Sequence, residues 1–333
     1  MLIKDISLTN FRNHSSYHLD FKPDTTLILG ANGCGKTSVL EAIYMLTRGK
    51  SFRATDPDII KRNTDFYRIE LNYQNGEQIV ATYDGVTKLY KTKDKASHRL
   101  SAKNKYPVIL FEPHDLNLVS GPPARRRDYF DQLFSDFSEE YATAINKYKK
   151  AIRQRNELLK SETIRKDTLY SWNLLLATFG SFLNLARKTY FSGLNQSLNP
   201  TYHSIAENSD TISITYRPVA ENLTKETYLH YLDESFEKDK ILGFTSFGIH
   251  RDAVDFIFNN QPADGSASRG ETRSIILALK FVEANTTTAK FGKKPLILLD
   301  DVFSELDFTR RRALIDNFKD NQVVITSVED VLN

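Results

Sequence analysis

The sequence predicts an α/β protein with mixed β-sheets and a smaller, mainly helical lobe. Near its start, the apolar stretch 25–29 has the pattern of a strand and runs directly into a glycine-rich loop that opens a helix. Near its end, the stretches 294–301 and 322–326 contain the apolar runs of buried parallel strands. A long region between them has helical periodicity. Because 333 residues exceed the ~100 to 200 of a typical domain, two lobes are expected.

The composition is that of an ordinary folded protein. Its 40% hydrophobic and 26% charged residues exclude a disordered or membrane-embedded class, and no apolar run approaches the ~20 residues of a membrane helix. Residues 1–8 alternate apolar and polar side chains without the apolar core of a secretory signal, so we expect a cytoplasmic protein with no membrane partner. The single cysteine, Cys34, excludes an internal disulfide. The net charge of +3 does not by itself require a polyanionic partner.

The first third of the chain predicts strands. Residues 2–8 alternate like a strand, and 68–73 and 78–83 alternate around Asn75-Gly76, which is a strong hairpin signal. A third strand is expected at 86–91. Basic residues then crowd a loop or sheet edge before an apolar strand at 107–111; they are Lys88, Lys91, Lys93, Lys95, Arg99, Lys103 and Lys105.

The middle of the chain predicts an antiparallel helical hairpin. From about Asp128 the pattern turns helical, with Tyr148, Ile152, Arg155 and Leu159 spaced by three and four positions, and a polar loop at 161–167 interrupts it. Helices of roughly 25 residues would reach ~38 Å, which makes a short arm. The seam expected to form the core of the second helix is Trp172, Leu175, Phe179, Leu183, Ala186 and Tyr190.

The glycine-rich loop has the full phosphate-loop pattern, Gly30-Ala-Asn-Gly-Cys-Gly-Lys-Thr37, between a predicted strand and helix. Its glycines permit the backbone turns that direct N–H groups at phosphate oxygens. Lys36 is expected to neutralise the β and γ phosphates of ATP and Thr37 to hold Mg²⁺. The expected nucleotide contacts are Gly30, Ala31, Asn32, Gly33, Cys34, Gly35, Lys36, Thr37 and Ser38. At Cys34 a small residue that fits is the simpler interpretation, and redox control of nucleotide binding is the alternative.

Two carboxylates follow the apolar stretch 296–299. Asp300 is placed to join the Mg²⁺ shell, and Asp301 to orient or deprotonate the attacking water. An acidic turn at the end of a strand is the plain alternative. The segment Ser304-Glu-Leu-Asp307 favours the catalytic interpretation, because this motif after two acids matches the D-loop of ABC-type ATPases.

Upstream, Ser266-Ala-Ser-Arg-Gly-Glu271 resembles the ABC signature, in which Ser268, Gly270 and a helix N-terminus face a γ-phosphate. Ser268 and Glu271 also fit a helix capping box, and the two interpretations are compatible. In ABC-type proteins the signature of one subunit closes over the phosphate loop of another. The resemblance therefore implies a homodimer held together by ATP.

Further motifs resemble the RecF family of bacterial DNA repair proteins almost from end to end. They are Asn10-Phe-Arg-Asn13, Gly49-Lys-Ser-Phe-Arg53, Phe111-Glu-Pro-His-Asp-Leu116, Gly121 through Arg127, Gly248-Ile-His-Arg-Asp252 and 299–307. The resemblance implies an ABC-type ATPase head at 1–112 and 245–333 and a helical arm at 113–244. It also implies an ATP-dependent dimer that binds DNA and works with RecO and RecR to load RecA at gapped DNA.

The chain departs from the family pattern at a few positions. The family usually has Gln where this chain has Glu271, and Pro where it has Ile249. Because a carboxylate would repel a γ-phosphate, we expect Glu271 to face away and cap its helix. Asp301 stands where transporter ATPases have a longer catalytic Glu, although RecF-like sequences share the Asp. Slow ATP hydrolysis that times release from DNA is therefore expected.

Other candidate residues rest on analogy or charge. Arg12 and Asn13 are expected to contact nucleotide phosphate, with a polar turn as the alternative. His114 and Asp115 lie where ABC-type proteins have a glutamine lid that senses Mg²⁺. Three arginines at a helix start are unfavourable without an anion, which DNA or a nearby Asp128 or Asp131 would supply. The candidate DNA contacts are Arg125, Arg126, Arg127, Lys91 and Lys93.

Two other classes share the nucleotide motifs. The ATPase subunit of a membrane transporter has the same loop, signature and D-loop. Against it stand the roughly 230 residues between loop and signature, the helical hairpin within them, and Thr326-Ser327 in place of a switch histidine. A chromosome-organising ATPase of the SMC kind would need a far longer arm.

Overall fold

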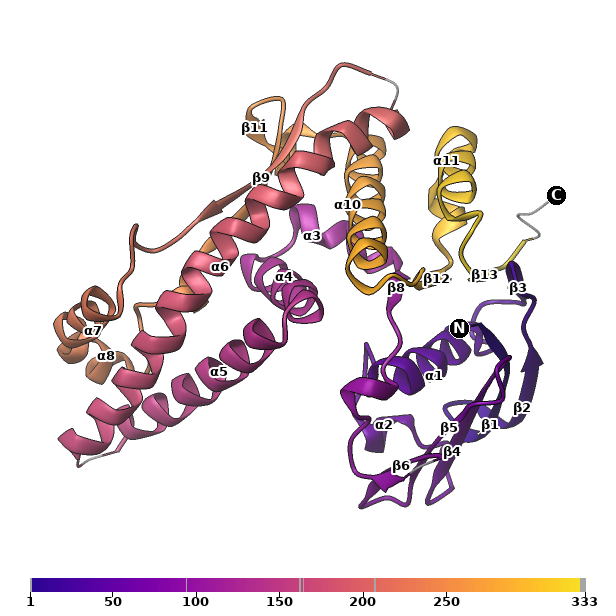
Figure 1. The fold of residues 1–333 in the computed structure, drawn as a ribbon, viewed down its shortest axis with the longest axis horizontal. Coiled ribbons are helices and arrows are strands. Elements are labelled where there is room, and N and C mark those ends of the chain that lie inside the picture. The colour runs from indigo at the N-terminus through magenta and orange to yellow at the C-terminus, as the bar shows by residue number, and fades with distance from the viewer. Residues whose placement is uncertain (1, 94, 162, 164, 207, 330–333) are drawn as a thin grey trace. The chain divides into compact units, whose positions relative to one another are not determined.

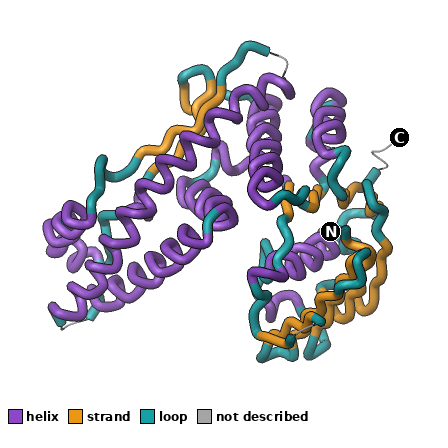
Figure 2. The backbone as a smooth tube through the Cα atoms, in the orientation of Figure 1, coloured by secondary structure: helices purple, strands orange, loops and turns teal. Residues whose placement is uncertain are grey.

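The computed structural model describes residues 2–93, 95–161, 163, 165–206 and 208–329. The chain divides into two compact units. The first contains 1–115 and 283–333, and the second contains 116–282 (Figures 1 and 2). Sequence reasoning placed the head at 1–112 and 245–333. The first unit ends at residue 115, close to the expected 112. It resumes at 283 and not at 245, because residues 245–282 pack with the second unit.

An antiparallel sheet forms one layer of the first unit. Its strand order in the described chain is β2-β1-β4-β5-β6-β7. The predicted hairpin is present, with Gly76 at a φ of 83° in its turn. The strands are β1 (Ile3–Phe11), β2 (His14–Asp20), β4 (Tyr67–Tyr73), β5 (Gln78–Tyr83), β6 (Lys88–Thr92) and β7 (Ala96–Ser97).

A parallel sheet with the order β3-β13-β12-β8 forms the second layer. Its strands are β3 (Thr25–Leu29), β8 (Val108–Phe111), β12 (Leu296–Asp300) and β13 (Val323–Ser327). The central strands β12 and β13 are mostly apolar and buried along their whole length, as strands covered on both faces are. The mixture of parallel and antiparallel sheets confirms the predicted fold class.

Helix α1 (Lys36–Arg48) packs against strands of both sheets, and its apolar residues are buried with theirs in one core. On the parallel sheet, Phe318 of helix α11 meets Phe111 of β8 edge to face. Shorter elements of this unit are α2 (Asp56–Ile59), η1 (Ala102–Asn104), η4 (Val302–Glu305) and α11 (Phe308–Phe318), and η2 (Pro113–Leu116) ends at its boundary. The position of α1 matters most, since its first turn carries the phosphate loop.

The second unit is built on helices α4 (Pro123–Phe137), α5 (Glu139–Leu159) and α6 (Lys166–Ala206). Hydrogen bonds join Arg155 to Asn173 and Tyr141 to Arg187, so α5 and α6 run antiparallel, as predicted. The predicted length of about 25 residues was wrong for α6, which has 41. Its last turns no longer face α5: Asn195 exchanges two hydrogen bonds with the backbone of Ile214.

The predicted seam of α6 was also wrong in part. Leu183 is buried, but Leu175 is 38% exposed. The buried face lies beside the predicted one and carries polar residues, which a search for apolar periodicity rejects. Those polar residues are Asn173, Asn184 and Arg187.

Sequence reasoning missed a small antiparallel sheet with the order β11-β10-β9, which packs on α4 and α6. The second unit also contains shorter elements and the start of a long helix. They are α3 (Asn117–Ser120), β9 (Ile212–Arg217), α7 (Lys225–Glu234), α8 (Phe236–Leu242), η3 (Ile249–Arg251), β10 (Ala253–Phe258), β11 (Gln261–Pro262), α9 (Ala263–Ser266) and the start of α10 (Arg269–Phe291).

A buried ion pair holds α7 and α8 to the hairpin. Arg155 and Asp239 are both 0% exposed, with a 2.7 Å contact, and Arg155 also donates to Asn173 and Thr245. Replacing Arg155 by Ala would leave the Asp239 carboxylate buried without its cation, so we expect a loss of about 3 to 5 kcal/mol in unfolding free energy. Urea unfolding would measure it, with the exposed neighbour Arg153→Ala as the control.

Candidate nucleotide site

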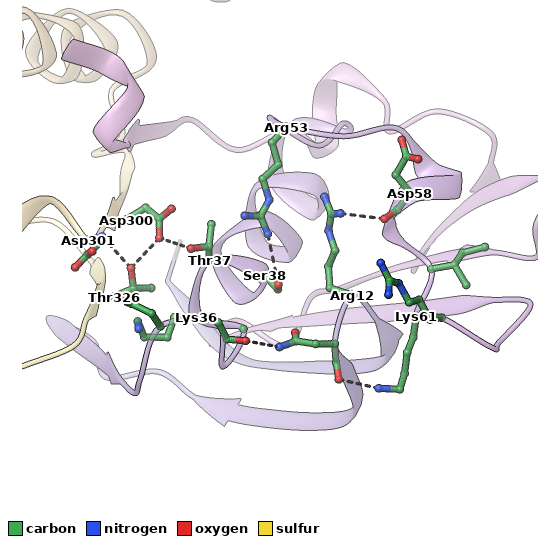
Figure 3. A pocket seen from close by; sticks show the side chains of 16 residues that line it. Arg12, Lys36, Thr37, Ser38, Arg53, Asp58, Lys61, Asp300, Asp301 and Thr326 are labelled. Atoms are coloured by element: carbon green, nitrogen blue, oxygen red, sulfur yellow. Dashed lines mark hydrogen bonds between the residues drawn. The ribbon is translucent and has the colours of Figure 1, made fainter. Parts of the chain in front are cut away.

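The predicted phosphate loop opens onto a pocket of about 670 Å³ in the first unit (Figure 3). The described residues that line it all belong to that unit. They come from the loop and α1, from the turn after β1, from 53–62, and from the ends of β12 and β13. The sequence-predicted members are Arg12, Asn13, Asn32, Gly33, Gly35, Lys36, Thr37, Ser38, Asp300 and Asp301.

Two glycines let the loop close. A Cβ at Gly35, which has a φ of 102°, would lie 2.3 Å from the ring of His14. A Cβ at Gly30 would lie 2.6 Å from the sulfur of Cys34. The exposed Cys34 thiol therefore lies over the start of the loop. Within the loop, the Lys36 ammonium donates to the carbonyl oxygens of Gly30 at 2.5 Å and Ala31 at 3.1 Å.

The two predicted Mg²⁺ ligands are in direct contact. The Thr37 hydroxyl donates to Asp300 at 2.8 Å, and Thr326 donates to the same carboxylate oxygen at 2.9 Å (Figure 3). Mg²⁺ in nucleotide sites typically takes one or two protein oxygens together with phosphates and waters. A hydroxyl and a carboxylate at this separation beside the loop fit that requirement.

Asp301 follows at the end of β12 in a left-handed conformation with a φ of 52°. Its backbone N–H donates to the Thr326 hydroxyl at 3.0 Å and to the Thr326 carbonyl oxygen at 3.2 Å. Thr326 thus positions both acids, a role that the sequence did not reveal. Thr326 lies on β13, next to β12, which carries Asp300 and leads into Asp301, so its side chain can contact both acids.

A buried carboxylate on α1 organises the basic side of the pocket. Glu41 is 0% exposed and pairs with Arg12 at 2.7 Å and Arg53 at 3.0 Å. Ser51 also donates to it at 2.6 Å. Burial alone would raise the pKa of Glu41, but the hydrogen bonds from Arg12 and Ser51 and the charge of Arg53 outweigh it and lower the pKa. One acid thereby holds two guanidinium groups that line the pocket.

The structure places both Arg12 and Asn13 at the pocket. Arg12 has a φ of 57° and also donates to the carbonyl oxygen of Asp58 at 2.9 Å, while Asn13 donates to that of Gly33 at 3.1 Å. Sequence reasoning missed Glu41, Arg53, and the basic Lys61 and Arg62 of the lining. The signal for Glu41 was an acid within the apolar face of a helix.

The signature segment lies in the second unit, at the start of α10. The backbone N–H of Ser268 donates to Glu271 at 2.6 Å, and the N–H of Glu271 donates to the Ser268 hydroxyl at 3.3 Å. This reciprocal pair is a capping box. Glu271 therefore caps its helix, as expected, and Ser268 remains exposed, with Gly270 in the first turn.

The three arginines at the start of α4, Arg125 to Arg127, differ in exposure. The prediction that Arg126 contacts DNA was wrong. Arg126 is only 7% exposed, and it donates to the carbonyl oxygens of Val254 and Gly121. Arg127 is half-buried and donates to the carbonyl oxygen of Asp252 at 3.0 Å. Arg125 is also partly exposed.

The other weak candidates lie apart from the pocket lining. Lys91 and Lys93 are exposed on or next to β6. Asp115 accepts from the N–H of Glu112 at 3.0 Å and thus closes a turn, and His114 is exposed beside it. These contacts explain Asp115 without a lid function.

Comparison with known proteins agrees with this geometry. A model of the AAA ATPase domain family matches residues 1–294. The DNA replication and repair protein RecF of Natranaerobius thermophilus is 34% identical over 99% of this chain and 92% of its own length. RecF of Lachnoclostridium phytofermentans is 30% identical over 100% and 95%.

Solved structures give the same result. The recombination mediator protein RecF of the RecFOR pathway, solved with ATP, is 27% identical with a TM-score of 0.88, covering 100% of this chain and 93% of that one. An SMC head bound to the winged-helix domain of ScpA, at 15% identity and a TM-score of 0.55, shares the fold alone.

The fold and the site define a P-loop protein with an AAA ATPase domain, whose fold is shared with the head of SMC proteins. Within that class, the chain belongs to the RecF family of DNA replication and repair proteins. This membership displaces the transporter alternative. Nor does any helix in the described residues have the length and apolar character to cross a membrane.

Replacing Glu41 by Gln would remove the charge that holds Arg12 and Arg53. Because the folded-state pKa is lowered, the stabilisation by this group is fully present above the unfolded pKa of about 4.3 and is lost as pH falls through the lower folded value. We expect the variant to melt at a lower temperature at pH 7 and to show less acid sensitivity below about pH 4. Thermal unfolding across pH measures both, and an unchanged acid profile would contradict this assignment.

Replacing Asp300 by Asn keeps the hydrogen bond from Thr37 but removes the charge that Mg²⁺ requires. We expect ATP to bind wild-type protein more tightly with Mg²⁺ than with EDTA, and this difference to shrink about tenfold in the variant. Calorimetric titration with and without metal measures it. Equal Mg²⁺ enhancement in both proteins would exclude Asp300 as a ligand.

Proposed function

We propose that this chain is an ATP-switched DNA-binding protein of recombinational repair. ATP and Mg²⁺ join two copies into a dimer that binds gapped DNA, and with RecO and RecR it helps to load RecA. Slow hydrolysis then releases the DNA. The RecFOR pathway in which the solved relatives act supports the RecO and RecR partners.

One observation carries the dimer proposal. The phosphate loop, Lys36, Thr37 and Asp300 meet in one pocket, all of whose described lining belongs to the first unit. The signature residue Ser268 is exposed in the second unit, at a helix N-terminus that suits an anion. A second copy of the chain would supply this terminus to the γ-phosphate in trans, since one ABC-type subunit cannot complete its own site.

The chain's residues divide the work of the site. Thr37 and Asp300 would hold Mg²⁺, which would supply positive charge to neutralise the phosphates. Lys36 would neutralise the β and γ phosphates, and Asp301 would orient the attacking water or take its proton. Asp301 is shorter than the Glu of transporter ATPases, which supports slow turnover.

Sedimentation and DNA anisotropy, each with ATP and Mg²⁺, with ADP, or without nucleotide, test the proposal. We expect a dimer and tight DNA binding with ATP and Mg²⁺ only. Ser268→Arg should bind ATP normally but fail to dimerise, because the added side chain would occupy the partner's γ-phosphate position.

Matched variants separate this effect from loss of the helix cap. Ser268→Ala removes the cap, worth about 1 kcal/mol, without adding bulk, and Ser192→Arg places the same side chain at an exposed position of α6. Ser192→Arg should dimerise normally. Ser268→Ala, which keeps the backbone N–H groups of the helix start, should dimerise more weakly than wild type but more strongly than Ser268→Arg. Wild-type protein that stays monomeric and does not bind DNA with ATP would overturn the proposed function.

A further inference from the structure

The motif Gly248-Ile-His-Arg-Asp252 lies within the second unit and is not part of the lining of the nucleotide pocket. Its residues Ile249 and His250 line the floor of a separate pocket of about 510 Å³ between α4 and α5. These two helices meet at a bend at Ser138 (Figure 1). The lining residues recur every three or four positions on the facing sides of both helices. They include Arg127 and Asp128 on α4, and Lys149, Ile152 and Arg153 on α5.

Hydrogen bonds fix the floor of this pocket. Burial lowers the pKa of His250 to about 4, so its ring is neutral. Its Nε2 donates to the carbonyl oxygen of Thr245 at 3.0 Å, and its Nδ1 accepts from Tyr148 at 2.9 Å. Tyr148 in turn accepts from Tyr228 at 2.8 Å. A Cβ at Gly248 would lie 2.3 Å from the Tyr228 hydroxyl, which explains the glycine.

The charges of the floor are also paired. Arg187 is 4% exposed and contacts Asp131 and Asp252, each at 2.8 Å. It donates as well to the carbonyl oxygen of Ile249 at 2.8 Å. The polar groups of the floor are therefore paired with one another within the protein.

The rim of the pocket, unlike its floor, has more basic than acidic side chains: Arg127, Lys149 and Arg153 against Asp128 and Asp131. Lys149 lies 3.1 Å from Asp128 and 3.6 Å from Asp131. In the described chain, Arg127 forms no ion pair, and its one hydrogen bond goes to the carbonyl oxygen of Asp252. Burial lowers the pKa of Arg127, and the charge of Arg187 lowers it further, whereas the charges of Asp128 and Asp252 oppose this shift. A half-buried guanidinium with no carboxylate in direct contact is costly, and an anion in the pocket would offset part of the cost.

The surroundings favour a polyanion with an organic body. Arg153 is exposed at the rim, without an ion pair in the described residues, and further lysines, Lys147 and Lys150, are exposed on the same helix. A guanidinium fork matches the oxygens of a phosphate. Ile152, which is partly exposed, offers apolar surface to the sugar or base attached to that phosphate.

We propose that the pocket between α4 and α5 binds a phosphate group of a DNA strand, with Arg127 and Arg153 as its donors. The proposal rests on the DNA binding proposed above and assigns a site to it. The remaining lysines of α5 hold neighbouring phosphates. The hydrogen-bonded floor holds Arg127 in place. This would be the function of the Gly248–Asp252 motif.

Arg153→Glu tests the site, because Arg153 is exposed and its loss should not disturb folding. Lys225→Glu, an equal change of charge at an exposed position of α7 that does not line the pocket, is the control. DNA affinity is measured by anisotropy with a fluorescent gapped duplex, ATP and Mg²⁺ over a range of salt. We expect Arg153→Glu to raise Kd roughly tenfold and to lower the salt slope by about one, and the control to change Kd less than about twofold.

Arg127→Gln should also weaken DNA binding, and an unchanged thermal unfolding midpoint would show that the fold of the second unit is intact. Unchanged DNA affinity in both variants, or an equal loss in Lys225→Glu, would overturn the site while leaving the proposed function standing. Failure of the wild-type protein to bind DNA would overturn both. Thermal unfolding with added inorganic phosphate distinguishes a DNA phosphate from a free phosphate ion. If phosphate stabilises the wild type but not Arg153→Glu, while the DNA affinity of the variant is unchanged, DNA is excluded as the occupant.

Discussion

The nucleotide site depends on one hydrogen bond, from the Thr37 hydroxyl to Asp300, which joins residues 263 positions apart. The bond can form because the parallel sheet brings the carboxyl ends of β3, β13 and β12 to one edge. Thr326 on the central strand contacts both acids across that edge. The order of these three strands therefore sets the positions of the phosphate loop, the predicted metal ligands and the expected base.

Buried ion pairs determine the finer geometry in each unit. Glu41 holds two arginines at the nucleotide pocket, Arg187 bridges two aspartates, and Arg155 pairs with Asp239. Each buried charge would be costly alone and is tolerated because an opposite charge contacts it; the partners of Arg155 and Arg187 are buried too, whereas those of Glu41 are partly exposed. Such networks constrain geometry more than apolar contacts do, since a small displacement leaves a charge without its partner.

Local signals predicted the parts of the fold that local physics determines. The loop Gly30–Thr37, the hairpin at Asn75-Gly76 and the buried strands before Asp300 and Thr326 each carry a pattern complete within a few residues. The buried face of α6 was missed because Asn173, Asn184 and Arg187 are polar, and their burial depends on partners distant in sequence. Glu41 and Arg53 were missed for the same reason, since neither reveals the other until both sheets are in place. Arg126 was misassigned because a basic residue in sequence gives no sign of the carbonyl oxygens it will meet.

The position of Cys34 has a practical consequence. It is the one cysteine of the sequence, it is exposed, and its sulfur lies over the first glycine of the phosphate loop. A thiol-reactive fluorophore would therefore attach at a single known place beside the phosphates, without any engineered residue. The native chain carries its own attachment point for an optical reporter of nucleotide occupancy.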